Sequence, residues 1–225
     1  MDFSKLLNNL GINFKNRELL ETSFTHRSYL NEVKNIKFSN ERMEFLGDSV
    51  LSFIISTYLY NIRPNDPEGD LTNLRSYIVK TETLANISKK LELGTYLKLS
   101  KGEELSGGRD NTQLLANTFE ALLGAIFLDQ GVEVAGKVLE RILLPEVREE
   151  IEKGPPKDSK SELQEVVQLR TKKSPFYKIL KTSGPDHTRK FLVGVFVNGK
   201  LLAEGSGFSK QAAEEEAAKE ALEKL

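Results

Sequence analysis

The sequence predicts an all-α domain followed by a small α+β domain with the element order α-β-β-β-α. Apolar residues recur at helical spacing through the first two thirds of the chain. The consecutive Pro155 and Pro156 end that pattern, and strand-like alternation follows. We therefore expect a first domain at residues 1–152, a linker at 153–157 and a second domain at 158–225.

The first domain should consist of helices around one core. Turn-rich stretches at 63–70 and 102–111 separate its apolar, helix-periodic segments. We expect helices at Phe3–Leu10, Leu19–Tyr29, Met43–Tyr60, Leu71–Leu91, Leu114–Leu128 and Val132–Ile151.

The second domain should begin and end with a helix. Ser161–Leu169 has helical periodicity, whereas apolar residues alternate with others along 191–197. Asn198-Gly199 is a strong signal for a two-residue hairpin turn. An Ala- and Glu-rich helix should follow 205–209, which completes the α-β-β-β-α order of small double-stranded-RNA-binding domains.

The charge is divided unevenly between the two domains. The chain of 225 residues has a net charge of -1, which excludes a uniformly basic nucleic-acid binder. Residues 1–153 carry 19 basic and 23 acidic residues, and 154–225 carry 13 and 10. Residues 157–200 alone carry 10 basic and 4 acidic residues, so a polyanion can bind there.

Composition favours the cytoplasm. The chain has no cysteine, so it has neither disulfides nor a thiolate metal site. Residues 1–17 lack the apolar core of a secretion signal. The longest uncharged run, Ser49–Ile62, is shorter than the roughly 20 residues of a membrane span, so we expect no membrane segment.

Acidic residues share one face of a predicted helix. Glu41, Glu44 and Asp48 follow i, i+3, i+7 spacing and so lie within about 60° of one another. On a second helix Asn117 and Glu120 are one turn apart, and if the two helices pack together these oxygens form a site suited to Mg²⁺. Spacing alone favours the other reading, in which the acids are solvated surface residues.

A longer match overturns that preference. The segment 40–51, NERMEFLGDSVL, resembles the nine-residue signature of the ribonuclease III family, with Met43 in place of the usual leucine. The flanking segments 25–29, 68–71 and 119–125 match in the same order. The resemblance covers nearly the whole chain, and it implies an all-α endonuclease domain followed by a small α+β double-stranded-RNA-binding domain.

The resemblance also implies the metal site. It places Glu44, Asp48, position 117 and Glu120 around a catalytic Mg²⁺, for which Mn²⁺ can substitute. Catalytic roles fall to Asp48 and Glu120, with Glu41 and Glu68 as accessory catalytic residues near a second metal or the scissile phosphate. The family has Asp at position 117, and this chain has the isosteric but neutral Asn117, which is either natural or engineered and puts full activity in doubt.

The implied reaction is an in-line displacement by water. Two Mg²⁺ ions about 4 Å apart would activate the water and stabilise the departing 3′ oxygen, which leaves 5′-phosphate and 3′-hydroxyl ends. Covalent catalysis is not supported, because cysteine is absent and His26 and His187 are the only histidines. His26 is better explained as a packed or hydrogen-bonded residue.

Cutting both strands of a duplex requires two such sites, which a two-fold homodimer provides. By resemblance, the dimer leaves two-nucleotide 3′ overhangs, and the aromatic residue at Phe45 inserts into the partner. The alternative for Phe45 is a place in the core of its own chain.

The resemblance assigns duplex contacts to the second domain. They are Gln164, Glu165 and Gln168 in one minor groove, His187 in the next, and Ser209 and Lys210 at a helix N-terminus near phosphate. The family usually has lysines at Gln211 and Glu214, so this last contact is weakened. Arg109 is a further phosphate candidate, with a plain turn as the alternative.

We therefore interpret the chain as a Mg²⁺-dependent endonuclease for double-stranded RNA that acts in rRNA and mRNA processing. The alternative is a cleavage-deficient double-stranded-RNA-binding protein, motivated by Asn117. A third reading is a helical scaffold whose acidic face binds protein.

Overall fold

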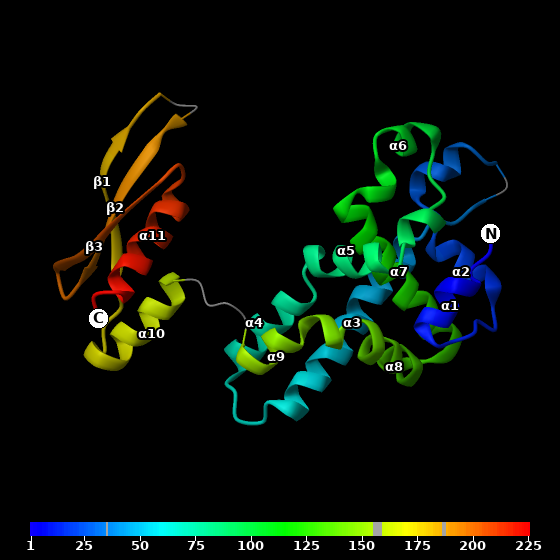
Figure 1. Ribbon diagram of the computed structural model, residues 1–225, viewed down its shortest axis with the longest axis horizontal. Coiled ribbons are helices and arrows are strands. Elements are labelled where there is room, and N and C mark those ends of the chain that lie inside the picture. The colour runs from blue at the N-terminus through cyan, green and yellow to red at the C-terminus, as the bar shows by residue number, and fades with distance from the viewer. Residues whose placement is uncertain (35, 155–158, 186–187) are drawn as a thin grey trace. The chain divides into compact units, whose positions relative to one another are not determined.

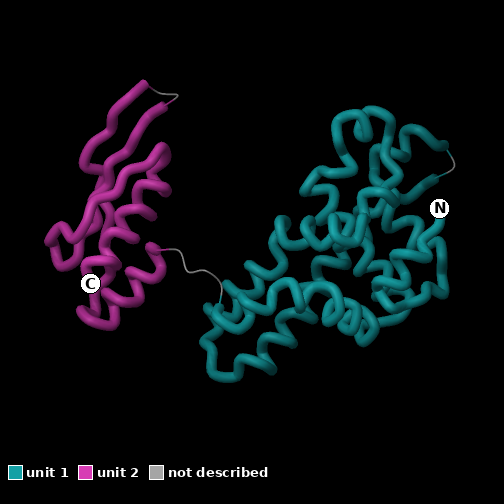
Figure 2. Tube along the Cα trace, in the orientation of Figure 1, with its two compact units in different colours: residues 1–155 teal, residues 156–225 magenta. Residues whose placement is uncertain are grey.

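A computed structural model describes residues 1–34, 36–154, 159–185 and 188–225. The chain divides into two compact units, Met1–Pro155 and Pro156–Leu225 (Figure 2). The division falls inside the predicted linker, of which residues 155–157 lie outside the described part.

The first unit is helical, as predicted, and in its described residues only a single isolated bridge, Thr25 with Lys98, has β character. Figure 1 shows its helices arranged around α3 and α7. The α-helices are α1 (Ser4–Leu10), α2 (Arg17–Ser23), α3 (Glu41–Ile62), α4 (Glu68–Ile78), α5 (Thr81–Lys90), α6 (Lys101–Leu105), α7 (Thr112–Gln130), α8 (Val132–Ile142) and α9 (Arg148–Lys153). Short 3₁₀ turns are η1 (Arg27–Asn31), η2 (Leu93–Tyr96), η3 (Gly108–Asp110) and η4 (Leu144–Val147).

Three predicted helices are wrong in extent. The Leu71–Leu91 segment is two helices, because Lys80 adopts an extended conformation between α4 and α5. The Val132–Ile151 segment breaks into α8, η4 and α9 at Pro145, whose nitrogen cannot donate a helical hydrogen bond. The helix predicted at Leu19–Tyr29 ends early, at Ser23.

Helices α3 and α7 form the centre of the core. Most of α7 is buried, whereas α3 buries one face that includes Val50, Leu51 and Ile55. Helices α2, α5 and α8 pack around α7. The positions of the acidic residues therefore follow from how α3 and α7 cross.

Glycines allow these two helices to touch. A Cβ built on Gly47 of α3 would lie 1.8 Å from the carbonyl oxygen of Glu120, and one on Gly124 of α7 would lie 2.3 Å from that of Met43. No side chain larger than hydrogen fits at either position without separating the helices. The crossing point is thus fixed beside the acidic residues.

The second unit has the predicted order of one helix, three strands and one helix. They are α10 (Ser159–Thr171), β1 (Phe176–Ser183), β2 (Lys190–Val197), β3 (Lys200–Gly207) and α11 (Lys210–Leu222). The antiparallel sheet has the order β1-β2-β3, and Asn198 and Gly199 both have positive φ in the predicted hairpin turn. Leu163 and Val167 of α10 and four alanines of α11 complete its core against Val195 and Ala203.

One helix of the described chain, α3, is long and apolar enough to meet the length and composition criterion for a membrane span. Core helices meet the same criterion. Here α3 packs against α7, and three carboxylates lie in its first two turns. These observations favour the core reading and agree with the expectation of no membrane segment.

Candidate functional site

The acidic residues of α3 lie at its N-terminal end. Glu41 and Glu44 occupy the first turn, where the helix dipole favours negative charge, and Asp48 follows one turn later. The buried Asn40 fixes this end: its carbonyl oxygen accepts from the amides of Met43 and Glu44 at 2.9 Å, and its amide group donates to the Ser23 carbonyl oxygen at 3.3 Å. The carboxylates therefore start from a rigid backbone.

Helix α7 brings the second half of the site. Asn111 caps its N-terminus by accepting from the Leu114 amide at 3.1 Å. Asn117 and Glu120 are half-buried on the side of α7 that meets α3. Two helices that are far apart in the sequence thus contribute to one acidic region.

The carboxylates are close enough to affect one another's protonation. Burial, followed by the negative charges of Asp48 and Glu44, raises the pKa of Glu120 to about 7. Burial and the charge of Glu41 also raise the pKa of Glu44, although a hydrogen bond from Asn117 opposes this shift. Glu44, Asp48 and Glu120 therefore interact electrostatically, and Asn117 interacts with Glu44 through a hydrogen bond.

Asn117 presents its donor end to the carboxylates. Its side-chain oxygen accepts from Gln113 Nε2 at 2.7 Å, and its NH₂ group donates to Glu44. Cations bind to amide oxygens and not to amide nitrogens. Before it could ligate a cation, the Asn117 amide must rotate and give up the bond from Gln113.

A pocket of about 290 Å³ opens on this region. Glu41, Glu44 and Asn117 line it together with His26 and Arg27. Within the residues that the structure describes, no three His, Cys, Asp or Glu side chains form a set that could ligate one ion by themselves. The donor chemistry nevertheless fits a hard divalent cation, because mutually repelling carboxylates with raised pKa values gain most from a cation that draws them together.

Three residues that line this pocket or bond to its lining were not predicted as functional. Arg27 lies at its edge and contacts Glu41 Oε1 at 3.4 Å through Nη1, while Ser39 Oγ donates to Glu41 Oε2 at 2.9 Å. Gln113 positions Asn117, and its i, i+4 spacing from Asn117 was the available signal. His26 has the structural role expected of it, since its Nδ1 accepts from the Ser28 amide and caps η1.

Glu68 is not brought to this pocket within one chain. Glu68 is the first residue of α4, which follows the C-terminal end of α3. Helix α3 extends about 27 Å from Glu44 to Ile62, and the turn that leads to Glu68 comes after Ile62. Arg75 donates to Ser56 Oγ at 3.0 Å, which shows that α4 runs back along the distal half of α3. A role for Glu68 at the cluster of its own chain is excluded by this distance.

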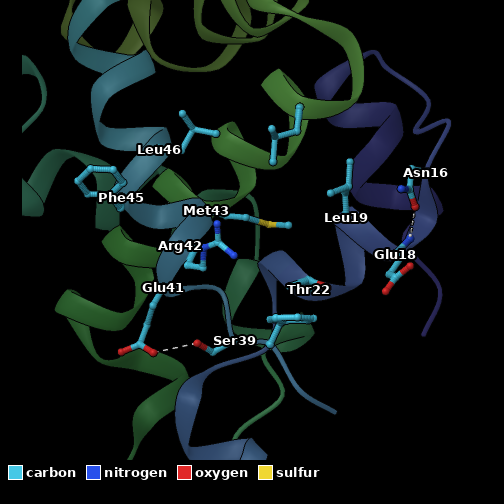
Figure 3. Close-up of a pocket in the computed structure, with 12 residues that line it drawn as sticks. Asn16, Glu18, Leu19, Thr22, Ser39, Glu41, Arg42, Met43, Phe45 and Leu46 are labelled. Carbon is cyan, nitrogen blue, oxygen red and sulfur yellow. Dashed lines mark hydrogen bonds between the residues drawn. The ribbon is translucent and has the colours of Figure 1, made fainter. Parts of the chain in front are cut away.

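An apolar groove lies on another side of α3. Its volume is about 800 Å³, and its lining includes Leu19, Met43, Leu46 and Leu128. Figure 3 shows Phe45 at its edge, with Leu19 and Thr22 across from it. Phe45 is 79% exposed, so the alternative of a core position in its own chain is wrong.

The predicted RNA contacts of the second unit are mostly at the surface. Gln164, Glu165 and Gln168 lie on the face of α10 that points away from its core, and Lys210 is exposed at the start of α11. Ser209 caps α11 by accepting from the Ala212 amide at 3.1 Å. His187 lies outside the described residues.

Arg109 has a structural role in this fold. Its Nη1 donates to the carbonyl oxygens of Gly94 and Leu97 at 2.8 and 2.9 Å, and its Nε donates to Glu104 at 2.7 Å. These bonds fasten η2 to η3. These bonds favour the plain-turn alternative for Arg109 over phosphate binding, because most of the N–H donors of its guanidinium are already used.

Comparison with known proteins agrees with this geometry. The family model described as "Ribonuclease-III-like" matches residues 16–147. A Ribonuclease 3 of Lactococcus lactis is 47% identical over 219 residues, which cover 97% of this chain and 94% of the relative. The chain belongs to the ribonuclease III family.

Other comparisons extend this assignment. The "Double-stranded RNA binding motif" model matches residues 159–225. A Ribonuclease 3 of Streptococcus gordonii is 47% identical over 224 residues, with the same coverage of 97% and 94%. The solved nuclease domain of ribonuclease III from Campylobacter jejuni has a TM-score of 0.61 at 35% identity and covers 65% of this chain and 99% of that domain. This member of the ribonuclease III family is therefore a double-stranded-RNA endonuclease with a helical nuclease domain and a C-terminal double-stranded-RNA-binding domain.

Proposed function

We propose that this protein cleaves double-stranded RNA with Mg²⁺, or Mn²⁺ in its place, held by Glu44, Asp48, Asn117 and Glu120. The observation that carries the proposal is Glu120, a half-buried carboxylate whose pKa is raised to about 7 beside Asp48 and Glu44. Such a group is poised to exchange a proton for a metal ion. Its place on α7, against α3, is fixed by Gly47.

The chain's own residues prepare this site. A divalent cation bound here would neutralise the charge of the phosphodiester and acidify the attacking water. The Asn117 donor partly offsets the rise in the Glu44 pKa, and Glu120 must lose its proton before the site is fully charged. In-line attack on phosphorus with departure of the 3′ oxygen leaves a 5′ phosphate and a 3′ hydroxyl.

We further propose that the active form is a homodimer in which Phe45 enters the apolar groove of the partner. Phe45 is exposed beside a groove of its own chain, and a two-fold axis close to it would bring each phenyl ring to the other chain's groove. The similar nuclease domain from Campylobacter jejuni is described as flexible in a region involved in dimer formation. Two sites across the dimer would cut both strands and leave two-nucleotide 3′ overhangs.

The dimer also supplies a place for Glu68. Because Glu68 lies beyond the distal end of α3, we propose that it acts at the acidic cluster of the other chain. If the two α3 helices pack antiparallel in the dimer, the distal end of one lies beside the acidic cluster of the other. Glu41, which lines the pocket, serves the cluster of its own chain.

Duplex binding is assigned to the second unit. Gln164, Glu165 and Gln168 form an exposed polar face on α10 that suits the 2′-hydroxyls of a minor groove. Ser209 and Lys210 place backbone amides and a cation at the N-terminus of α11, where a phosphate can bind. His187 would contact the adjacent groove.

A cleavage-deficient RNA-binding protein is the second candidate, and one observation favours it. Asn117 turns its NH₂ group toward Glu44, which is the wrong end of the amide for a cation. Incubation of labelled duplex with the dimer across Mg²⁺ and Mn²⁺ concentrations separates the two. Cleavage supports the endonuclease, and binding without cleavage at every concentration supports the second candidate.

The cellular role follows from the substrate. Long duplexes and hairpins occur in ribosomal precursors and in messenger RNA, so we assign the enzyme to rRNA and mRNA processing in the cytoplasm. Mapping of uncut precursors in cells that lack the protein tests this assignment, and unchanged precursors would contradict it.

A further inference from the structure

The pocket at the acidic cluster has a cation on its edge. Among the described residues that line it, Arg27 is the only arginine or lysine, whereas Glu41 and Glu44 are acidic. A polyanionic strand that approaches this pocket before the cluster is neutralised meets repulsion from the carboxylates. Arg27 is the group placed to offset that repulsion.

The backbone beneath Arg27 is firmly held. The Ser28 amide donates to His26 Nδ1, and Ser28 Oγ accepts from the Ser100 amide at 3.0 Å. The His26 amide donates to the Lys98 carbonyl oxygen at 3.1 Å. The backbone at Arg27 is therefore held in place, and the side chain can change conformation without moving it.

The Arg27 side chain itself is only weakly engaged. It is 71% exposed and meets Glu41 at 3.4 Å, which is long for a charge-assisted bond, usually about 2.7–2.9 Å. Glu41 is held separately by Ser39. In the described part of the chain, the other N–H groups of Arg27 have no hydrogen-bond partner.

We infer that Arg27 binds a backbone phosphate of the RNA strand that enters this pocket and releases Glu41 as it does so. The inference rests on the proposed function, because it places the substrate strand at the acidic cluster. A guanidinium matches a phosphate with two parallel hydrogen bonds, which is a better pairing than one long bond to Glu41. Strand entry thereby frees a carboxylate at the edge of the cluster.

Substitution at Arg27 tests this directly, with Arg17 as the matched control. Arg17 is 67% exposed, also pairs with a glutamate on the same unit, and does not line the pocket. Duplex binding is measured in EDTA over a range of salt, with the unfolding midpoint of each variant as a check on folding. We expect Arg27→Ala to weaken binding about tenfold and to lower the slope of log K against log salt by about one, while Arg17→Ala changes neither.

A second pair of variants separates phosphate binding from positioning of Glu41. In the Glu41→Gln background, Arg27→Ala should still weaken binding and flatten the salt slope. The inference is overturned if Arg27→Ala leaves duplex binding unchanged in the Glu41→Gln background. It is also overturned if Arg27→Ala has no more effect on binding than Arg17→Ala in the parent protein. Because binding in EDTA requires no cleavage, a protein that binds but never cuts contradicts the proposed function alone.

Discussion

The main chain of Glu120 lies against Gly47, so that a Cβ on Gly47 would come within 1.8 Å of the Glu120 carbonyl oxygen. This backbone contact also positions the acidic site. Glu44 and Asp48 flank Gly47 on α3, and the residue of α7 that Gly47 contacts, Glu120, itself carries the third carboxylate. The distance between the two sets of acids is therefore set by a glycine.

Gly47→Ala should destabilise the nuclease unit and separate the acidic residues. The helices must move apart to accept a methyl group, at a cost of about 3 kcal/mol, the upper end of ordinary overpacking. The midpoint of denaturant unfolding measures this. Gly136→Ala is the control: Gly136 is inside α8 with open space around it, so its replacement should stabilise by about 0.5–1 kcal/mol. Equal effects of the two substitutions would contradict the close approach.

Asn117→Asp should strengthen metal binding and cleavage. A carboxylate adds a negative charge to the ligand set and needs no rotation to present oxygen, while Gln113 can still donate to it. We expect an Mg²⁺ affinity about tenfold higher, equal to about 1.4 kcal/mol. Asn111→Asp is the control. It adds the same charge at the N-terminus of α7, where Asp caps a helix as well as Asn does, and it should leave the Mg²⁺ affinity nearly unchanged. A gain from Asn111→Asp alone would point to general electrostatics.

Metal affinity should rise as the pH rises through 7. Glu120 has a raised pKa of about 7, so it is mostly protonated below that pH and must release its proton to bind a cation. Calorimetry in buffers of different ionisation enthalpy measures this proton release between pH 6 and 8. Glu120→Gln should abolish it, and release that persists in this variant would assign the proton to another group.

The same shift predicts how stability depends on pH without metal. Because the folded state holds the Glu120 proton more tightly than the unfolded state does, this group stabilises the fold below its unfolded pKa, and the contribution is lost as pH rises through about 7. Glu120→Gln should therefore stabilise the metal-free protein more at pH 8 than at pH 5. Unfolding curves at the two pH values measure the difference.

A mixed dimer tests the place of Glu68. One chain carries Glu68→Ala and the other Glu120→Gln, so action across the dimer leaves one site whole and the other doubly impaired. The mixed dimer should then nick only one strand of each duplex. If Glu68 acts within its own chain, both sites are impaired and neither strand is cut. Denaturing gels of end-labelled strands distinguish these outcomes.

Sequence pattern accounts for much of this fold and part of the site. The i, i+3, i+7 acids on one helix, the hairpin at Asn198-Gly199 and the strand at Lys190–Val197 depend on local sequence, and the structure has each of them. Local geometry also explains the errors: Lys80 and Pro145 interrupt apolar patterns that continue through them.

Other features depend on tertiary contacts that no local pattern contains. Arg109 resembles a phosphate ligand until its guanidinium is found against the carbonyl oxygens of η2. Glu68 matches the family in sequence, yet its distance from Glu44 becomes evident only when α3 is seen as one continuous helix of 22 residues. Gln113 and Arg27 acquire roles only through their neighbours in space.

Glu214 illustrates how a tertiary pair changes an expectation. It lies on α11 where the family usually has lysine, and Lys160 of α10 pairs with it at 2.6 Å. Glu214→Gln frees the Lys160 charge and should strengthen duplex binding, with the salt slope steeper by about one. Glu223→Gln, also on the second unit but outside this pair, is the control, and equal gains would show only a change in net charge.

Anomalous diffraction from crystals soaked in Mn²⁺ tests most directly whether the two helices hold a divalent ion between them. We expect a peak within about 2.2 Å of carboxylate oxygens of Glu44, Asp48 and Glu120. A peak elsewhere, with none at these three residues in either the parent or Asn117→Asp, would contradict the proposed site.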